Sequence, residues 1–526
     1  MSCKHDRESG SVKKEYLTMS ALNLPQYLKL KVQQFVERIF LRDFGAQRAY
    51  TYRDLATVTD QLAGALQELG IQPGERVALL HPNHSDFILG YLAVIRAGAV
   101  AVPINPAYTA KEALFILKDS GACCLLTTSA FEPLLWEIKG QAAHLGEIVV
   151  KDAGQSLLEA LNMRVKGVKR VADQHRAADD PAFIFYTSGT TGQPKGVVLT
   201  HRNLIFGGAN TAQNYGLRET DVTIACLPLV HIFANASPVF GSLNSGGSVV
   251  VTPRFQTEVI FEAIEQYKVT WFPGVPTMFG YLLQAFDAKP RNVSSLRMGL
   301  SGGASLSVEH LTRFEKAFQA ILLEVYGLTE STGLVTANPV YGVRKSGSIG
   351  INVSGVSVRL VDPDGRDTPE GEVGELIFRG PNATPGYWQR PEMTAASIKN
   401  GWVYTGDLAR RDEDGYYYIA GRKDELIISG GYNIYPREIE EVLYRHADIV
   451  EAAVIGAKDQ HLGEVPRACI ALRSGSSLTA EAVLEFCGAH LAAYKIPKQI
   501  EIMPELPKNP TGKILKKKLT QKGETK

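Results

Sequence analysis

Two hydrophobic periods alternate along the first third of the chain, from residue 24 to about residue 178. In some stretches apolar residues recur three or four positions apart, which is typical of a helix with one buried face. Others are short continuous apolar runs, which are typical of buried strands. We expect helices at Tyr52–Leu69 and Ser85–Ile95, and strands at Arg76–Leu80, Cys123–Thr127 and Glu147–Val150. Strands that alternate with helices predict layered α/β structure.

The same alternation continues through the middle of the chain. Ala182–Tyr186 predicts a buried strand and Val197–Leu199 its return strand. Thr200 is placed to cap a helix that begins near His201. Further strands are expected at Asp221–Leu227, Ser248–Thr252, Thr270–Phe272, Met298–Ser301 and Leu323–Tyr326, with helices over Asn203–Gln213 and from Glu258. The last two strands open into glycine-bearing segments, which suits the ligand crevice of an α/β sheet.

The pattern changes twice toward the C-terminus. From Val356 short β runs are separated by Gly, Asp and Pro, which predicts a compact β subdomain over about residues 345–422. Residues 424–526 predict a small α+β domain behind the linker Lys423-Asp424-Glu425. Its expected elements are helices Pro436–His446 and Thr479–Leu491 and strands Ile449–Ile455 and Cys469–Leu472. The predicted organisation is therefore a polar tail (1–20), a large N-terminal domain (21–423) and a small C-terminal domain (424–526).

Composition and charge narrow the class of protein. The 526 residues are 45% hydrophobic and 21% charged, with a net charge of +1, which suits a globular protein with a sizeable core and gives no reason to expect nucleic acid. The six cysteines show neither a C-x-x-C nor a metal-ligand spacing, so we expect reduced thiols in the cytoplasm. Residues 1–20 lack the apolar core of a signal peptide. Phe87–Pro103 is too short to span a bilayer and predicts a buried helix followed by a strand, so we expect no integral membrane segment.

The loop between the two central strands carries the first chemical signal. Thr187–Gly196 contains three glycines, four hydroxyls and one lysine, and no acidic residue. Glycines let backbone N–H groups approach an anion closely, hydroxyls donate further hydrogen bonds, and a lysine adds a mobile charge, so the loop suits a polyphosphate. It is not a P-loop, because Pro194 precedes Lys195 and Gly196 follows it. From composition alone, a glycine-rich surface hairpin is the alternative.

The whole string YTSGTTGQPKG resembles the phosphate-binding motif of the adenylate-forming enzymes, which include acyl-CoA synthetases, luciferases and peptide-synthetase adenylation domains. The resemblance covers roughly residues 45 to 515 and includes several further motifs. They are Gly302-Gly303-Ala304, Tyr326-Gly327-Leu328-Thr329-Glu330, Tyr404-Thr405-Gly406-Asp407, Gly421-Arg422-Lys423-Asp424, the segment Ser429–Glu440 and Leu506–Ile514. It implies a large α/β domain with a β subdomain and a small, mobile α+β C-terminal domain.

The resemblance also implies an ATP site. Tyr326 is expected on the adenine, Thr329 on the α-phosphate, and Asp407 with Arg422 on the ribose. A Mg²⁺ ion is expected on Glu330 and Thr187, because a hard dication on phosphates needs only one or two protein oxygens. The full expected ATP-binding set is Thr187, Ser188, Gly189, Thr190, Thr191, Gly192, Lys195, Gly302, Gly303, Ala304, Tyr326, Gly327, Thr329, Asp407, Arg422 and Lys513.

Lys513 matches the family's catalytic lysine. A carboxylate that attacks an α-phosphate brings two anions together, and a nearby ammonium lowers that barrier. Catalytic roles are expected for Lys513, Glu330 and His231, with the histidine positioning the acyl group. The neighbouring Lys516, Lys517 and Lys518 are interpreted as a solvated helix face, with peripheral membrane attraction as the alternative.

Three further groups of residues follow from the resemblance. Gly430 and Gly431 are expected to form the passage for the pantetheine arm of CoA, and Asp424 the hinge of the small domain. The acyl pocket is expected at His231, Ile232, Phe233 and Met278.

Together these motifs imply that a carboxylic acid reacts with ATP to give acyl-AMP and then with CoA to give acyl-CoA. A medium- or long-chain fatty acid or an aromatic acid is expected, because the residues around His231 are apolar. No acidic residue lies between Asp221 and Glu258 to bind an amino-acid ammonium. A luciferase-like enzyme, a ligase acting on a carrier protein and a non-catalytic ATP-binding relative stay as alternatives, and both monomer and homodimer remain open.

Overall fold

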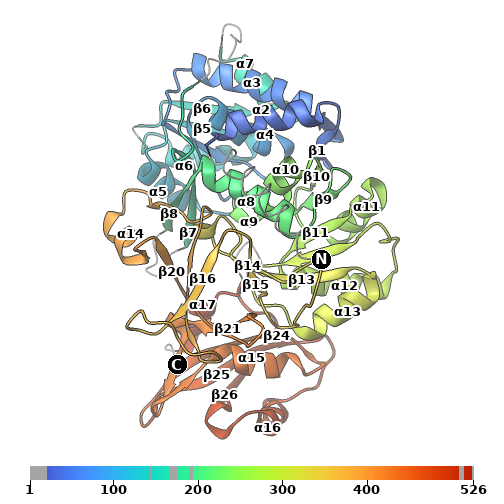
Figure 1. The fold of residues 1–526 in the computed structure, drawn as a ribbon, viewed down its shortest axis with the longest axis vertical. Coiled ribbons are helices and arrows are strands. Elements are labelled where there is room, and N and C mark those ends of the chain that lie inside the picture. Colours follow the sequence, from blue (N-terminus) through green and yellow to red (C-terminus); the bar gives the residue numbers. More distant parts are fainter. Residues whose placement is uncertain (1–20, 143, 166–173, 189–193, 509–513, 524–526) are drawn as a thin grey trace, which may run out of the picture.

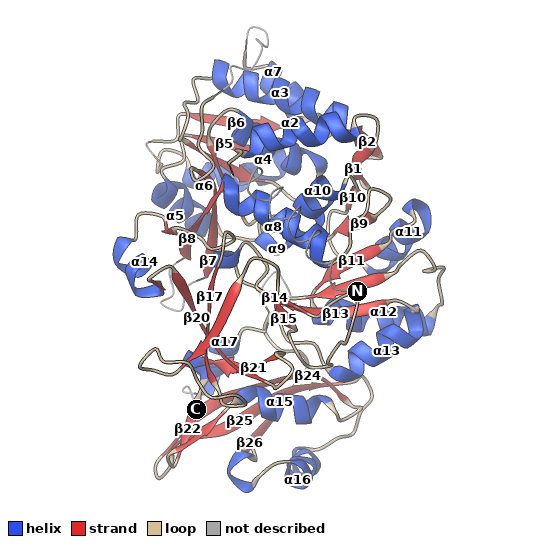
Figure 2. Cartoon of the chain, viewed as in Figure 1, coloured by secondary structure: helices blue, strands red, loops and turns tan. Residues whose placement is uncertain are grey.

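The computed structural model describes residues 21–142, 144–165, 174–188, 194–508 and 514–523. Elements from the first half of the chain lie at one end of the long axis and those from the last hundred residues at the other (Figure 1). Within the described residues the strands form four sheets, two large and two small. Figure 2 shows helices packed over the large sheets, which confirms the predicted α/β class.

The first large sheet has the order β18-β8-β7-β4-β3-β5-β6. Its strands are β3 (Arg76–Leu80), β4 (Val100–Ile104), β5 (Cys124–Thr128), β6 (Glu147–Lys151), β7 (Pro181–Ser188), β8 (Pro194–Thr200) and β18 (Gly386–Tyr387). In β3, Val77 and Leu79 face one hydrophobic core, whereas Ala78 and Leu80 face another. Burial on both faces explains why the strands of this sheet are continuous apolar runs.

The second large sheet has the order β15-β14-β13-β12-β11-β9-β10-β1-β2. Its strands are β1 (Ile39–Asp43), β2 (Arg48–Thr51), β9 (Val222–Ala225), β10 (Ser248–Val251), β11 (Trp271–Gly274), β12 (Met298–Ser301), β13 (Ile321–Tyr326), β14 (Thr336–Ala337) and β15 (Ile351–Asn352). Strands β1 and β9 to β13 run parallel to their neighbours in the middle of the sheet. Their carboxyl ends therefore meet at one edge.

Helices cover both sheets and share one core with them. They are α2 (Leu24–Phe35), α3 (Tyr52–Glu68), α4 (Ser85–Arg96), α5 (Ala110–Ser120), α6 (Glu132–Ile138), α7 (Leu157–Asn162), α8 (His201–Asn214), α9 (Ile232–Ala234), α10 (Ser242–Ser245), α11 (Thr257–Tyr267), α12 (Pro276–Ala288) and α13 (Val308–Phe318). Helix α8 begins as predicted, since the Thr200 side chain accepts a hydrogen bond from the Asn203 N–H in a capping box.

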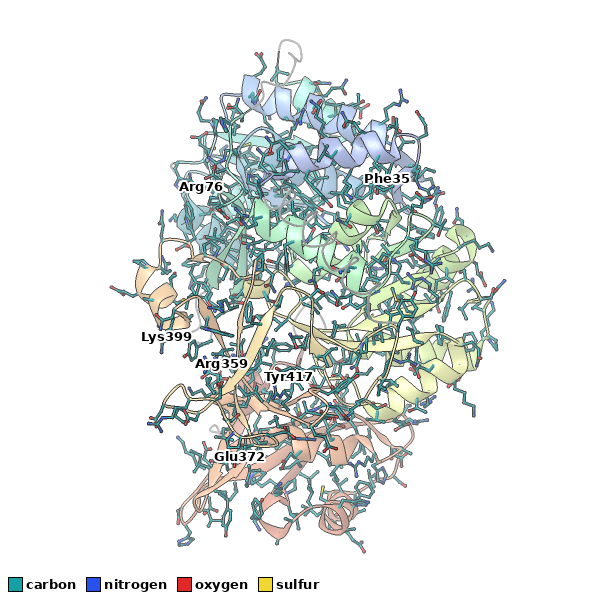
Figure 3. The ribbon with its side chains drawn as sticks, viewed as in Figure 1. Phe35, Arg76, Arg359, Glu372, Lys399 and Tyr417 are labelled. Carbon is teal, nitrogen blue, oxygen red and sulfur yellow. The ribbon has the colours of Figure 1, made fainter. Side chains whose placement is uncertain are left out.

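The β subdomain forms a five-stranded sheet of β16 (Ser357–Val361), β17 (Gly374–Arg379), β19 (Ile398–Lys399), β20 (Trp402–Arg411) and β21 (Tyr417–Arg422). Tyr417, labelled in Figure 3, is buried in a core that this sheet shares with β12 and β13. One segment of the expected subdomain belongs to a different sheet. Strand β18, which is followed by α14 (Pro391–Ser397), pairs with β8 of the first large sheet. This pairing brings Tyr387 to the glycine-loop strands, and nothing in the local sequence indicates it.

The last part of the chain has its own small core. Its elements are β22 (Ile427–Ser429), β23 (Tyr432–Ile434), α15 (Pro436–Tyr444), β24 (Ile449–Asp459), β25 (Gly463–Leu472), α16 (Ala480–His490), β26 (Gln499–Met503) and α17 (Lys516–Gly523). The expected linker is a single 3₁₀ turn, η4 (Lys423–Glu425), between β21 and β22. No helix among the described residues is long and apolar enough to cross a membrane.

One prediction about this region is wrong. Lys516 does not lie on a solvated helix face, because its ammonium pairs with Glu425 at 2.9 Å and with Glu440 at 2.8 Å. Only a fifth of its side chain is exposed. Burial alone lowers the pKa of Lys516, but the two carboxylates outweigh burial and raise it. The lysine thus ties α17 to both the linker turn and α15, whereas Lys517 and Lys518 are exposed as expected.

Candidate active site

Two parallel strands place two of the motifs side by side. Ser301 at the end of β12 pairs with Glu324 of β13, so the segments after both strands leave the same edge of the sheet. A Cβ at Gly302 would lie 3.3 Å from the Phe233 ring and 3.0 Å from Val325. Glycine at this position therefore allows the chain to pass directly over an aromatic ring of the expected acyl pocket.

The second motif turns back sharply after Tyr326. A Cβ at Gly327 would collide with the backbone of Gly333, so only glycine fits this close approach of two chain segments. Thr329–Ser331 follows as a 3₁₀ turn, η3, in which the Glu330 side chain is buried. The turn fixes the direction in which the Glu330 carboxylate leaves the backbone.

The Glu330 carboxylate meets two other segments. Lys195 Nζ donates to Glu330 Oε1 at 2.9 Å and to the Tyr387 hydroxyl at 2.8 Å, and that hydroxyl donates to the same carboxylate oxygen at 2.8 Å. The ammonium also lies 4.2 Å from the centre of the Tyr387 ring, at cation–π distance. Burial alone lowers the pKa of Lys195, but the Glu330 charge and Tyr387 outweigh it and raise the pKa, so the lysine stays charged.

A second group of contacts joins Tyr326 to the β subdomain. The Tyr326 hydroxyl donates to Asp407 Oδ2 at 2.6 Å, and Arg422 donates to Asp407 Oδ1 at 2.9 Å. Arg422 also contacts Asp424 Oδ1 at 3.2 Å, which connects this group to the linker turn. Burial, and then the Asp407 charge, raise the pKa of Tyr326, so its hydroxyl keeps its proton and remains a donor.

Thr187 supplies an unsatisfied hydroxyl near the glycine loop. It stands opposite Lys195 in the antiparallel pairing of β7 and β8. Its Oγ1 is buried, and among the described residues it has no hydrogen-bond partner. A buried hydroxyl without a partner is costly, so it has the capacity to bind a ligand oxygen or a cation. With the Glu330 carboxylate it offers the two protein oxygens that suit Mg²⁺.

His231 is held by the chain segment that follows β9. Asn235 donates to the carbonyls of Leu229 and His231 at 2.6 and 2.9 Å, which fixes the turn before α9. Burial lowers the pKa of His231 to about 4, so its imidazole is neutral at pH 7. Its Nε2 is buried and has no hydrogen-bond partner among the described residues. A neutral ring with one unused nitrogen suits a positioning role.

The expected acyl-pocket residues lie close to the second motif. Ile232 and Met278 are buried in the large core, and Phe233 contacts both that core and the one shared with the β subdomain. A Cβ at Gly333, three residues after Glu330, would lie 3.2 Å from Ala236 and 4.0 Å from both Ile232 and Phe233. The segment that follows the Tyr326–Glu330 motif therefore packs against the acyl-pocket candidates.

Several predicted residues are not part of these contacts. Gly189, Thr190, Thr191, Gly192 and Lys513 lie outside the described residues. The flanks of the Lys513 segment are described, and Lys508 pairs with Ile514 in an isolated antiparallel bridge.

Gly430 and Gly431 form the exposed turn between β22 and β23, with φ of 56° and 86°, and Gly430 N–H donates to the Leu462 carbonyl at 2.8 Å. The contacts of Gly430 are with Leu462, within the C-terminal domain.

Sequence reasoning missed two residues of this region. Tyr387 reaches Lys195 only through the pairing of β18 with β8. Glu324 accepts a hydrogen bond from the Leu306 N–H at 3.0 Å and so holds the chain that follows Gly302 and Gly303. Burial raises the pKa of Glu324 to about 7. The only signal in the sequence was an acidic residue inside an otherwise apolar strand.

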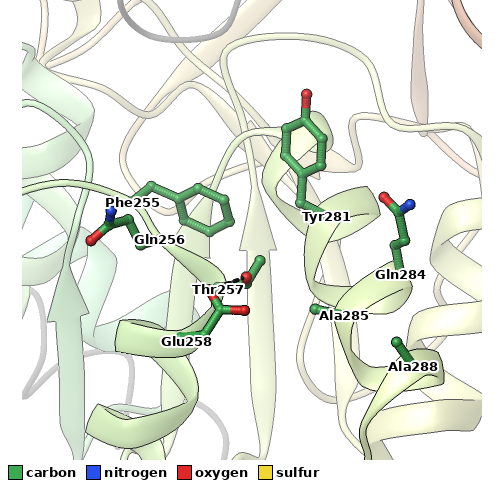
Figure 4. A pocket seen from close by; sticks show the side chains of 8 residues that line it. All are labelled: Phe255, Gln256, Thr257, Glu258, Tyr281, Gln284, Ala285 and Ala288. Atoms are coloured by element: carbon green, nitrogen blue, oxygen red, sulfur yellow. Dashed lines mark hydrogen bonds between the residues drawn. The ribbon is translucent and has the colours of Figure 1, made fainter.

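A shallow pocket of about 400 Å³ lies away from these motifs, between α11 and α12. Figure 4 shows Phe255 and Tyr281 on its two sides. None of the predicted site residues lines it. It is therefore not the site that the motifs indicate.

Comparison with known protein families agrees with the motifs. The family described as AMP-binding enzyme matches residues 28–388, and the AMP-binding enzyme C-terminal domain matches residues 438–513. The long-chain-fatty-acid–CoA ligase of Bacillus subtilis (strain 168) is 34% identical over 505 residues, which cover 90% of each chain. A feruloyl-CoA synthase of an Amycolatopsis species is 36% identical over 473 residues, covering 89% of this chain and 93% of that enzyme.

Solved structures share the whole fold. ATP-bound MatB from Rhodopseudomonas palustris is 30% identical and covers 96% of this chain and 99% of its own, with a TM-score of 0.87. The o-succinylbenzoate CoA synthetase MenE from Bacillus subtilis, in complex with its acyl-adenylate intermediate, is 31% identical, covers 95% and 98%, and has a TM-score of 0.83. The chain belongs to the AMP-binding enzyme family and is one of its acyl-CoA synthetases.

Proposed function

We propose that this acyl-CoA synthetase activates a medium- or long-chain fatty acid, or an aromatic acid, to acyl-AMP with Mg²⁺–ATP and then forms the CoA thioester. The apolar surroundings of Phe233 support an acid with an extended apolar part. The curated relatives act on acids of this kind by name, a long-chain fatty acid and ferulate. Five described cysteines are free thiols, which supports a cytoplasmic location.

The observation that carries the proposal is that one short segment joins two contact groups. Tyr326 donates to Asp407, which also accepts from Arg422, and Glu330, four residues after Tyr326, accepts from Lys195. In the proposed site, the Asp407 carboxylate accepts from the ribose hydroxyls, and Arg422 pairs with it at 2.9 Å. Lys195 remains protonated and presents its charge to the phosphates. These roles use groups from four distant chain segments within one connected network.

The proposed Mg²⁺ would be held by Glu330 and Thr187. When bound, the ion neutralises phosphate charge and orients the phosphates. The Thr187 hydroxyl fits because it is buried without a partner among the described residues. The Glu330 carboxylate fits because its present partners are an ammonium and a hydroxyl, which shows that its oxygen already attracts positive charge and donors.

The acyl side is proposed to use neutral residues. His231 is neutral at pH 7 and is proposed to hydrogen-bond the acyl carboxyl rather than transfer a proton to or from it. Lys513 is proposed to bridge the attacking carboxylate and the α-phosphate, and Gly430 and Gly431 to admit the CoA arm after a rotation at Asp424.

A panel of carboxylic acids tests the substrate class. Acetate, octanoate, palmitate, ferulate and benzoate are supplied with ATP, Mg²⁺ and CoA, and AMP and thioester are measured. We expect kcat/KM for the best fatty or aromatic acid to exceed that for acetate by at least about 100-fold, because each buried methylene contributes about 0.8 kcal/mol. Acetate as the best substrate would contradict the proposed class.

Glu330→Gln tests the metal ligand, because it keeps the shape and removes the charge. We expect the rate of adenylation to fall by about 100-fold and the Mg²⁺ concentration that gives half-maximal activity to rise, with the fold intact. Acid-dependent pyrophosphate release is measured across a Mg²⁺ titration, with Glu315→Gln as the control. An unchanged titration would place the metal ligand elsewhere.

A further inference from the structure

A second cluster of metal-ligating side chains lies apart from the nucleotide motifs. His81 follows β3, and His84 and Asp86 stand at the N-terminus of α4. One ligand-capable atom of each of these three residues lies within 4.8 Å of the others. Asp43 from the end of β1 and Lys151 from the end of β6 complete the surroundings. Three strand ends thus bring together two imidazoles, two carboxylates and one ammonium.

His81 is prepared as a ligand. Its side chain is 6% exposed, and its Nδ1 lies 2.8 Å from the Pro82 carbonyl. Because Nδ1 donates its proton to that carbonyl, the lone pair is on Nε2. This nitrogen is buried and has no hydrogen-bond partner among the described residues. An imidazole with one nitrogen bound to a backbone carbonyl and the other unused is how histidine is held for metal binding in proteins.

The His84 imidazole lies close to the carboxylates of Asp86 and Asp43. His84 Nδ1 is 3.4 Å from Asp86 Oδ2 and 3.5 Å from Asp43 Oδ2, and both carboxylates are 2% exposed. The Asp86 N–H donates to His84 Nδ1 at 3.1 Å, so a cation at this nitrogen would replace the hydrogen bond that caps α4. Asp43 is fixed by the N–H groups of Ser85 and Ala46, at 2.7 and 2.9 Å.

The charges favour a divalent cation. Asp43 and Asp86 bring two negative charges into a buried space, where the ammonium of Lys151 pairs with Asp86. The Lys151 side chain is only 8% exposed, so the protein already places one cation there. A single ammonium leaves one carboxylate charge uncompensated by direct contact, and buried charges require partners.

We propose that His81, His84 and Asp86 bind a divalent transition-metal ion, with Zn²⁺ as the best fit, and that Lys151 competes with this ion for Asp86. Two imidazole nitrogens and one carboxylate oxygen form a ligand set that suits Zn²⁺, Co²⁺ and Ni²⁺ rather than Mg²⁺ or Ca²⁺, which prefer oxygen. Asp43, whose Oδ2 lies 3.5 Å from His84 Nδ1, is then the candidate fourth ligand.

Asn83 connects this cluster to the chain segment that carries His231. Asn83 lies between the two histidines in the sequence, and its side chain bonds to the Leu227 carbonyl at 2.8 Å and the Leu229 N–H at 2.9 Å. That backbone leads directly to His231. A metal on His81 and His84 would therefore stiffen the turn that supports the acyl-side histidine.

The test measures Zn²⁺ binding by calorimetry and Co²⁺ binding by visible absorption, with reduced, nucleotide-free, full-length protein. Cys3 and His5 are replaced in every protein compared, because the N-terminal tail could bind metal itself. The variants are His81→Phe, which removes the unused nitrogen, and Lys151→Met, which removes the competitor. His461→Ala, an exposed histidine in the C-terminal domain, is the control.

We expect one Zn²⁺ site whose affinity falls by at least about tenfold in His81→Phe and rises by at least about tenfold in Lys151→Met, with the control unchanged. Zn²⁺ at a hundred times the wild-type Kd should raise the unfolding temperature of the wild type by about 2 °C or more. The same Zn²⁺ concentration should raise that of Lys151→Met further, because this variant binds Zn²⁺ more tightly. If His81→Phe does not fold, His84→Leu at the more exposed histidine gives the same comparison.

Equal Zn²⁺ affinity in wild type and His81→Phe, or weaker binding in Lys151→Met, overturns the proposal. Neither result bears on acid activation, because no acid, ATP or CoA is present in the experiment.

Discussion

The motifs proposed to bind ATP and those proposed to admit CoA differ in how they are held. Around Glu330 and Asp407 each charged group has partners from other segments, and the hydrogen bonds are 2.6 to 2.9 Å long. The Gly430–Gly431 turn, in contrast, is exposed, and a Cβ at Gly431 would meet nothing within 4 Å. Around it, Ile428 and Tyr432 are 55% and 59% exposed. One site is assembled in this structure, whereas the other presents an open apolar face.

The difference affects how much each region must rearrange during the reaction. Hydrogen bonds between segments preorganise a site, so that little is rearranged when charge develops. The exposed face around Gly430 and Gly431 keeps its contacts within the C-terminal domain, such as the Gly430 N–H bond to the Leu462 carbonyl, and its apolar side chains are open to dock against another surface. The chain passes from one region to the other through the η4 turn, where Arg422 bonds to Asp407 on one side and to Asp424 on the other. Changes in the C-terminal domain should therefore separate the two half-reactions, and changes at the nucleotide site should not.

The largest expected separation comes from Lys513→Ala. If this lysine stabilises only the adenylation transition state, adenylation should fall by about 100-fold or more, whereas thioester formation from added acyl-AMP should survive. Acid-dependent pyrophosphate release and thioester formation are measured separately. Lys518→Ala, an exposed lysine on α17, is the control, and an equal loss in both halves would falsify the assigned role.

Asp424→Pro should separate the half-reactions in the opposite direction. Proline locks φ near −65° and restricts Lys423, so rotation at the turn is blocked. We expect thioester production to fall by at least about tenfold more than pyrophosphate release. Asp424→Ala removes the contact with Arg422 without locking the backbone and serves as the control. A parallel loss of both activities, or of neither, would remove Asp424 as the hinge.

Tyr326→Phe should affect both half-reactions alike. It removes the hydrogen bond to Asp407 and keeps the ring, so KM for ATP should rise by about tenfold while kcat changes little, because a bond to a charged group contributes about 1.5–3 kcal/mol. Steady-state kinetics with varied ATP measure this, and Tyr416→Phe, which loses a bond to the Val343 carbonyl instead, is the control. A fall in kcat at unchanged KM would contradict a binding role for the hydroxyl.

The smallest effect on activity is expected for Glu324→Gln, which acts on stability. The pKa of Glu324 is raised from 4.5 to about 7, so the folded chain holds this proton longer than the unfolded chain, and stability is lost as the pH rises through that window. Glutamine keeps the acceptor for Leu306 and removes the charge. The free energy of unfolding of the variant, relative to that of the wild type, should therefore rise by up to about 3 kcal/mol as the pH is raised from 4.5 to 8. Denaturant unfolding at both pH values measures it.

Glu315→Gln is the matched control for this experiment, because Glu315 also accepts a backbone N–H of β13, that of Leu322, at 3.1 Å. A gain that is independent of pH would mean that the Glu324 proton is not the cause.

Local patterns predicted most elements of the fold correctly. Helix α8, strand β7 and the pair α4–β4 appear where the periodicity places them, because hydrophobic period and capping residues act over a few positions. Local patterns could not predict the position of Tyr387. Its strand, β18, pairs with β8 of the first large sheet, and a strand of two residues has almost no periodicity to detect.

The error at Lys516 has a related cause. Three consecutive lysines in a predicted helix favour an exposed face, since nothing nearby in the sequence compensates their charge. Glu425 and Glu440 lie more than seventy positions earlier, and only the packing of α17 brings them to Lys516.

The sequence by itself determined which chemical groups this protein carries. The loop proposed to bind phosphate, the carboxylate after a close-approach glycine and the lysine near the C-terminus are local strings, because their chemistry depends on residue type and short spacing. The tertiary structure decided which of these groups meet: Lys195 with Glu330, Tyr326 with Asp407, and His84, just before α4, with Asp43 of β1. Such meetings depend on parallel strand order and domain packing, which are set by burial over the whole chain rather than by any one segment.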